Sequence, residues 1–169
     1  MGIRIETQTP DHAGGLFAAL SDPRVYTHLD EDPPSSVSEL RARLERLTAG
    51  GPPDGSACWF NWTVFDDAEI VGYVQATLTG ETASIAYVLA PAAWGRGIAS
   101  EACRQMLEIL LRDAAPRRFV ADAARENLRS RRLLARLGFA LTHQTATDAF
   151  YAAGAAELAT SLRSRRDSL

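Results

Sequence analysis

Cysteine is scarce in this chain. Its 169 residues include only two cysteines, Cys58 and Cys103, and three histidines, at positions 12, 28 and 143. Neither cysteine belongs to a spacing typical of a metal site or a redox motif, and the histidines are isolated from one another, so we expect no bound metal. So few cysteines fit a reducing compartment, and we expect a cytoplasmic protein.

Long hydrophobic runs and a strong net charge are also absent. No stretch approaches the roughly 20 apolar residues that a membrane span needs. The opening MGIRIETQTPDH has no apolar core of signal-peptide length. The net charge of −3 creates no field that would draw the protein to nucleic acid or to anionic lipid. We therefore expect neither a membrane nor a nucleic acid as a partner.

The remaining composition is ordinary for a globular protein, with 46% hydrophobic and 23% charged residues. The length suits one domain with a sizeable core. The sequence has no internal repeat and no linker. Residues 1–169 are therefore predicted to form a single domain, with a frayed tail at 163–169.

Hydrophobic periodicity predicts a mixture of strands and helices. Apolar or alternating runs predict strands at 3–8, 57–65, 69–78, 82–90, 117–123, 140–146 and 155–163, of which the last two are expected to pair. Helical spacing predicts helices at 12–21, 39–49, 99–113 and 127–137. Asp11 is the predicted cap of the first helix, Ser36 or Ser38 caps the second, and Gly138 stops the last.

The order of these elements predicts an α/β fold. Strands 57–65, 69–78 and 82–90 are joined by short turns and so form an antiparallel meander. The helix at 99–113 is a crossover that makes strands 82–90 and 117–123 parallel. We therefore expect a mixed, largely antiparallel sheet of about six to seven strands flanked by helices.

A glycine pair lies where the strand at 82–90 gives way to the helix at 99–113, in the stretch PAAWGRGIAS. The first N–H groups of a helix have no partner within the helix and carry the positive end of its dipole. Gly95 and Gly97 keep side chains away from those groups, and Arg96 adds further donors. Together these residues are typical of a phosphate or pyrophosphate cradle, although a tight turn that merely needs glycines would look the same.

Two known cradles can be compared with this loop. A Walker loop requires a glycine-rich run ending in Gly-Lys followed by Ser or Thr, and the sequence has none. The dinucleotide fingerprint G-x-G-x-x-G is half met, because Ser100 stands where its last glycine or alanine belongs, and Asp122 could mimic its ribose-binding acid. Four residues separate the strand from Gly95, and the preceding strands form a meander. Both features disfavour a nicotinamide-dependent oxidoreductase, which stays as the weaker alternative.

The loop resembles the acyl-CoA pyrophosphate loop of the GCN5-related N-acetyltransferase (GNAT) family, whose pattern is Q/R-x-x-G-x-G/A. Trp94 stands at the Gln/Arg position, Gly97 at the glycine and Ala99 at the last small residue. The tryptophan departs from the general pattern and resembles the branch that contains ribosomal-protein N-terminal acetyltransferases.

A second stretch, ENLRSRRLLARLGF, resembles another signature of the same family, N-x-x-S followed by a helix that ends in Gly-Phe. The matching residues are Asn127, Ser130, Gly138 and Phe139. The order of elements also resembles the family's acyl-CoA N-acyltransferase fold along nearly the whole chain.

The resemblance implies an enzyme that uses acetyl-CoA as cosubstrate and needs no metal. It would transfer the acetyl group to a primary amine, on a protein N-terminus or a small molecule, by direct attack in a ternary complex. The family's habit also implies a homodimer. A CoA-binding regulatory protein that has lost catalysis remains an alternative.

The resemblance also implies which residues would meet acetyl-CoA. The residues expected to bind the cofactor are Leu89, Trp94, Gly95, Arg96, Gly97, Ile98, Ala99, Asn127, Ser130 and Arg131. The main-chain N–H of Leu89 would stabilise the oxyanion of the tetrahedral intermediate. Many relatives have a tyrosine as general acid where this chain has Leu134, so Ser130, one turn earlier, is our candidate acid.

Helical spacing places Arg131 on the same face as Asn127 and Ser130, near the CoA phosphates. We expect Arg129, along with Arg132 and Arg136, to be solvated. Two other features have ordinary explanations. Tyr87 is expected to be a packing residue, and the acidic run at 30–32 could attract a cationic amine but is more typical of a solvated loop.

Overall fold

Seven strands form one sheet in the computed structural model, which describes residues 2–166. The strands are β1 (Ile3–Thr7), β2 (Cys58–Asp66), β3 (Glu69–Thr79), β4 (Thr82–Leu89), β5 (Arg118–Ala124), β6 (Ala140–Gln144) and β7 (Asp148–Gly154). Their order across the sheet is β1-β2-β3-β4-β5-β7-β6, and every neighbouring pair is antiparallel except β4 and β5. The predicted meander, crossover and mixed sheet are confirmed.

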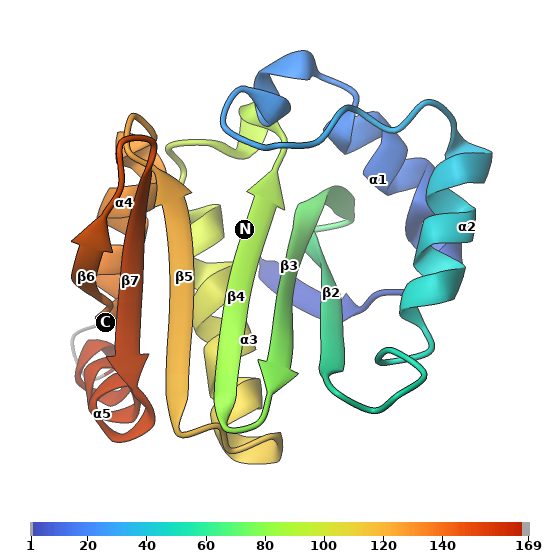
Figure 1. Ribbon diagram of the computed structural model, residues 1–169. Coiled ribbons are helices and arrows are strands. Elements are labelled where there is room, and N and C mark those ends of the chain that lie inside the picture. The colour runs from blue at the N-terminus through green and yellow to red at the C-terminus, as the bar shows by residue number, and fades with distance from the viewer. Residues whose placement is uncertain (1, 167–169) are drawn as a thin grey trace.

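Helices cover both faces of this sheet (Figure 1). They are α1 (Ala13–Leu20), α2 (Val37–Leu47), α3 (Ile98–Asp113), α4 (Leu128–Leu137) and α5 (Ala155–Arg166). The larger core lies between the sheet and α3, α4 and α5, and a smaller core lies between the other face and the pair α1 and α2. In α3 the buried residues Ala102, Met106 and Leu110 recur every four positions, which is the spacing that puts one helical stripe against a sheet.

The C-terminal region differs from the prediction. Residues 155–163 belong to helix α5, not to a strand, and β6 pairs with β7 instead. Leu158 and Leu162 lie one helical turn apart and are both buried, so they hold α5 against the larger core. Residues 163–166, expected to be frayed, are part of α5, and residues 167–169 lie outside the described part of the chain.

Of the predicted caps for helices α1 and α2, the one for α2 is confirmed and the one for α1 is wrong. Ser36 caps α2, because its Oγ accepts a hydrogen bond from the Glu39 N–H at 3.1 Å. Asp11 does not cap α1. It lies in a short 3-10 turn, Pro10–His12, that precedes the helix, and its carboxylate pairs with Arg41 at 3.3 Å.

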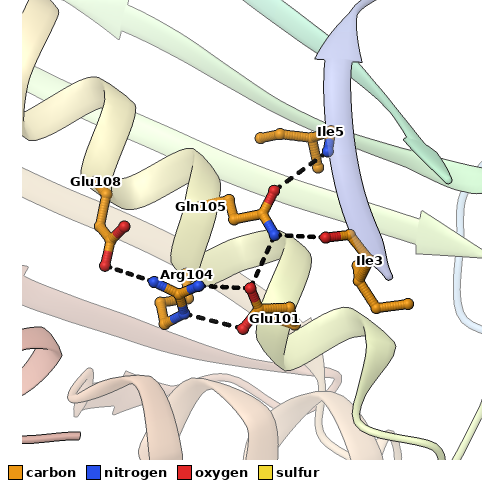
Figure 2. A network of polar contacts seen from close by, with 6 residues as sticks. All are labelled: Ile3, Ile5, Glu101, Arg104, Gln105 and Glu108. Carbon is orange, nitrogen blue, oxygen red and sulfur yellow. Dashed lines mark hydrogen bonds and ion pairs between the residues drawn. The ribbon is translucent and has the colours of Figure 1, made fainter. Parts of the chain in front are cut away.

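The outer edge of β1 is closed by a side chain of α3 (Figure 2). The Gln105 Nε2 donates a hydrogen bond to the Ile3 carbonyl at 2.8 Å, and its Oε1 accepts one from the Ile5 N–H at 3.2 Å. On the same helix Arg104 bridges Glu101 and Glu108. Gln105 therefore occupies backbone groups that an edge strand would otherwise offer to another strand.

Strands β4 and β5 are paired over only part of their length. The parallel register joins Thr82–Ser84 to Arg118–Val120 and stops there. Figure 1 shows the two arrows diverging toward their C-terminal ends. The last part of β4, up to Leu89, consequently has β3 beside it on one side and no hydrogen-bonded strand on the other.

Candidate functional site

The loop after β4 has the backbone that its glycines suggest. Gly95 and Gly97 have φ of 74° and 80°, in the left-handed region that favours glycine, and α3 begins directly after them at Ile98. A Cβ placed on either glycine would meet nothing within 4 Å, so both face open space. A 3-10 turn, Pro91–Ala93, separates β4 from the glycines, whereas a dinucleotide fingerprint turns immediately.

Arg96, between the two glycines, is held by the end of β2. Its Nη2 lies 2.8 Å from the Asp66 Oδ2. The Asp66 side chain is only 11% exposed. Its Oδ1 is buried and has no hydrogen-bond partner among residues 2–166. This ion pair fixes Arg96 beside the loop.

Trp94 connects the loop to two other elements. Its indole Nε1 donates a hydrogen bond to the Leu89 carbonyl at 2.9 Å, which ties the loop to the end of β4. The guanidinium carbon of Arg129 lies 4.0 Å from the centre of the Trp94 ring, a cation–π contact with the start of α4.

Two arginines of α4 make contacts that the sequence did not predict. Arg129 is exposed, as predicted, but its guanidinium also lies over the Trp94 ring of the loop. Arg131 donates to the Tyr151 hydroxyl and to the Arg125 carbonyl, each at 3.0 Å. Trp94 could have suggested that an arginine stacks on the loop, because an indole ring offers a face on which a guanidinium can lie.

The main-chain N–H of Leu89 points into the space that β5 leaves. The next residue, Ala90, donates its N–H to the Val71 carbonyl of β3 at 2.8 Å. Successive N–H groups of a strand point to opposite sides, so the Leu89 N–H points away from β3 and toward the diverging side. Gly72 of β3 allows the close approach here, because a Cβ on it would lie 2.1 Å from the Val88 carbonyl oxygen.

Two hydroxyls meet at the start of α4. Asn127 caps the helix, since its Oδ1 accepts the Ser130 N–H at 3.1 Å. The Ser130 Oγ lies 2.5 Å from the hydroxyl of Tyr87 on β4, and either oxygen can donate. Burial raises the pKa of the Tyr87 phenol, so this hydroxyl keeps its proton at neutral pH. Tyr87 thus places a polar group in the site, while Leu134 is fully buried.

A small hollow lies on the opposite face of the sheet, between β3 and the helices α1 and α2. Tyr73 and Gln75 line it from β3 and are paired in register with Val88 and Ala86 of β4. The hollow therefore borders the same half of β4 that diverges from β5. Glu31, from the acidic run, also lines it.

Two kinds of feature are missing from the part of the chain that the structure describes. None of its helices combines the length and the apolar character needed to cross a membrane. Nor do its His, Cys, Asp and Glu side chains gather in any group of three or more that could hold a metal ion.

Solved structures with the same fold are numerous. A GCN5-related N-acetyltransferase from Brucella melitensis has 20% identity and a TM-score of 0.79, with 98% of this chain and 81% of that chain covered. A spermidine N-acetyltransferase from Vibrio cholerae, in complex with CoA and spermine, has 13% identity and a TM-score of 0.78, with 93% and 98% covered. RimL, a ribosomal L7/L12 α-N-protein acetyltransferase in complex with CoA, has 20% identity and a TM-score of 0.77, with 90% and 93% covered. At these identities the similarity establishes the fold.

The family itself is established by the sequence. No curated protein has a significant match to the chain as a whole. The acetyltransferase (GNAT) domain family, however, matches residues 3–140, which include the sheet from β1 to β5, the glycine loop and α4. The chain therefore belongs to the GNAT acetyltransferase family.

Proposed function

We propose that this protein transfers the acetyl group of acetyl-CoA to a primary amine by direct attack in a ternary complex. The observation that carries the proposal is the divergence of β4 from β5, which leaves the Leu89 N–H free beside the glycine loop. A thioester in that space would have a main-chain donor aimed at its carbonyl oxygen.

The glycine loop is our proposed site for the CoA pyrophosphate. The open faces of Gly95 and Gly97 would let the phosphates approach the N–H groups at the start of α3. The other residues proposed to contact CoA are Leu89, Trp94, Arg96, Ile98, Ala99, Asn127, Ser130 and Arg131, to which the cation–π contact adds Arg129. Because Arg129 contacts the tryptophan of the glycine loop, we propose Arg129, ahead of Arg131, as the side chain that binds the CoA phosphates.

The reaction needs no nucleophile from the protein. The amine nitrogen forms a bond to the thioester carbon, and the carbonyl oxygen becomes an oxyanion that accepts a hydrogen bond from Leu89. The C–S bond then breaks, and a proton released by the nitrogen replaces the acyl group on the CoA sulfur. Losing one oxyanion donor typically costs about 3 kcal/mol of transition-state stabilisation.

Ser130 and Tyr87 are the groups that we propose for the proton on the sulfur. Their oxygens are 2.5 Å apart, and a hydroxyl can accept one proton while it donates another. Ser130 would donate to the thiolate and take a proton from Tyr87, and the proton released by the amine nitrogen would return to Tyr87, so that both hydroxyls end as they began. The pair would thus replace the tyrosine that many relatives have at the position of Leu134.

The acceptor is a primary amine on a small molecule or a protein N-terminus. The range of solved neighbours supports both classes, since one is a spermidine acetyltransferase and another acetylates a ribosomal protein. We further propose a cytoplasmic homodimer, supported by the low cysteine content and by the family's habit. Sedimentation of the purified protein tests the oligomeric state.

Two measurements together test this function. Calorimetry gives the affinity for CoA, and the release of free CoA from acetyl-CoA reports turnover with a panel of primary amines. Tight binding with amine-dependent release supports the enzyme. Tight binding without release supports the CoA-binding regulatory protein instead.

A further inference from the structure

Asp122 is a charged side chain beside the gap between β4 and β5, and neither the glycine loop nor the hydroxyl pair uses it. The parallel pairing of the two strands ends at Ser84 and Val120, and Asp122 is the second residue of β5 beyond that point. Continuing the register sets Asp122 level with Ala86, about 10 Å before Leu89 along β4. Asp122 therefore lies where the strands part, next to the space into which the Leu89 N–H points.

The side chain of Asp122 points to the sheet face opposite the glycine loop and α3. Its neighbours Ala121 and Ala123 are buried in the larger core, whereas Asp122 is exposed, as alternation along a strand requires. The smaller core on this other face draws on α1, α2, β3 and the end of β4. Figure 1 shows β5 from this side, with α3 behind the sheet. An acceptor from solvent can therefore reach Asp122 while CoA occupies the opposite face.

The charge of Asp122 is not neutralised by a neighbour. Its carboxylate takes part in no hydrogen bond or ion pair within residues 2–166. The other titratable side chains on this face of β5, β7 and β6 are Arg118, Asp148 and His143. Arg118 lies about 13 Å away along the strand, and His143 stacks on Phe150, the residue opposite Asp122. Asp148 adds a second negative charge, so a cation is the ligand that this position favours.

We propose that Asp122 binds the ammonium group of the acceptor and takes the proton that the amine must lose before it attacks, which rests on the proposed function. A primary amine is mostly protonated at neutral pH, and only its neutral form has the lone pair that attacks a thioester. One proton of the ammonium passes to the Asp122 carboxylate, directly or through one water, and the freed lone pair forms the bond to the thioester carbon. Asp122 then releases this proton to solvent.

Asp122 and the hydroxyl pair divide the two protons that the nitrogen loses. The first leaves before the attack, toward Asp122 on the solvent side of the sheet. The second leaves after the attack, toward Tyr87, which packs against the larger core on the other side, and it reaches the CoA sulfur through Ser130. The overall reaction converts an ammonium and a thioester into an amide, a thiol and one proton in solvent.

Asp122→Asn tests this role, because the amide keeps the size of the side chain and removes its charge. Hexylamine, spermidine and an alanine peptide serve as acceptors. For the acceptor that the wild type uses best, kcat/KM at neutral pH should fall by about 10²-fold or more. CoA affinity, measured by calorimetry, should not change. Glu81→Gln is the matched control, since it removes one exposed negative charge just before β4 begins, and it should leave kcat/KM unchanged.

The pH dependence separates a base from a residue that only supports the strand. In the wild type the carboxylate and the ammonium together form the reactive pair, so kcat/KM should change little from neutral pH up to the pKa of the amine. In Asp122→Asn the amine must already be neutral when it binds. The kcat/KM of the variant should therefore rise about tenfold per pH unit over that range, and its defect should shrink.

A wild-type kcat/KM in Asp122→Asn, an equal loss in Glu81→Gln, or a variant whose kcat/KM does not rise with pH would each overturn the inference. If the wild type releases no CoA with any acceptor, the proposed function fails, and binding decides the role of Asp122. Each amine is then titrated into protein saturated with CoA, where Asp122→Asn should weaken the best-bound amine by about tenfold or more. Equal affinity in the two proteins, or no binding to either, would overturn the inference as well.

Discussion

At the scale of single residues, the glycines of the loop make the sharpest claim. Gly95 and Gly97 adopt left-handed backbone angles and have open space where a Cβ would lie. A side chain there costs about 1–2 kcal/mol in backbone strain. It would also stand between a phosphate and the N–H groups at the start of α3.

Gly97→Val is therefore expected to weaken CoA binding by more than about tenfold, because a charge-assisted hydrogen bond to a phosphate is typically worth at least that much. Calorimetry on a folded variant measures the effect. Gly80→Val is the matched control, since Gly80 also has positive φ and open space but lies in the turn between β3 and β4. Unchanged CoA affinity in the Gly97 variant would contradict the proposed cradle.

The hydroxyl pair gives a second residue-scale prediction. Ser130→Ala and Tyr87→Phe should each lower kcat by about 10²-fold, a usual size for general acid catalysis, with little change in CoA affinity. The double variant should be scarcely slower than either single one, because both changes break the same hydrogen-bonded pair.

Ser21→Ala is the control for these variants, since Ser21 is an exposed serine whose hydroxyl bonds only within its own turn, to the Phe17 carbonyl. If the effects of the two substitutions on kcat simply add, the hydroxyls do not act as a pair. If Ser130→Ala loses CoA affinity and keeps its kcat, Ser130 binds the cofactor and water supplies the proton.

The two thiols should differ in reactivity. Cys58 is exposed, whereas Cys103 is fully buried in the larger core, and burial raises the pKa of its thiol. Because the thiolate is the reactive form, one thiol should react with a disulfide reagent in the native protein and two in denaturant. Two fast native thiols would mean that α3 is not packed as described.

At the scale of elements, the edge of β1 depends on one side chain of α3. Gln105→Leu would leave the Ile3 carbonyl and the Ile5 N–H without their partner (Figure 2). Both groups are partly buried, and a fully buried unsatisfied group costs about 1–3 kcal/mol, so the free energy of unfolding should fall toward the lower end of that range, as measured by denaturant titration.

Arg104→Gln tests whether the loss comes from the edge or from the polar network as a whole. Arg104 makes partly exposed ion pairs with Glu101 and Glu108, which are typically worth about 0–1 kcal/mol. The Arg104 variant should therefore be the more stable of the two. A larger loss in that variant would place the stabilisation in the ion pairs.

The elements also show what sequence periodicity can and cannot predict. The meander and the crossover follow from short turns and from the amphipathic stripe of α3, which are local features. The region 148–163 is rich in alanine, so its apolar pattern fits a strand as well as a helix, and both the strand β7 and the helix α5 were missed. The contact of Tyr87 with Ser130 joins residues 43 positions apart and is set by packing, which no local pattern reports.

At the scale of the whole molecule, partly buried tyrosines predict how stability changes in alkali. Burial raises the pKa of Tyr73 from the ordinary 10.0 to about 12. The unfolded chain ionises this phenol first, so the phenol's contribution to stability is complete below pH 10 and declines as the pH rises toward about 12. Tyr73→Phe should make the free energy of unfolding depend less steeply on pH between these values. An identical slope in the variant would contradict the burial of Tyr73.

The most direct test of the whole account is the initial rate of CoA release from acetyl-CoA, measured with a panel of primary amines. The Cys58→Ser variant is used, because its exposed thiol would otherwise react with the reagent that detects free CoA. For an acetyltransferase, the release should depend on the amine, should match the amount of acetylated amine found by mass spectrometry, and should fall sharply in Gly97→Val. If the protein binds CoA but no amine makes the release of CoA faster than it is without an amine, acetyl transfer to a primary amine is contradicted.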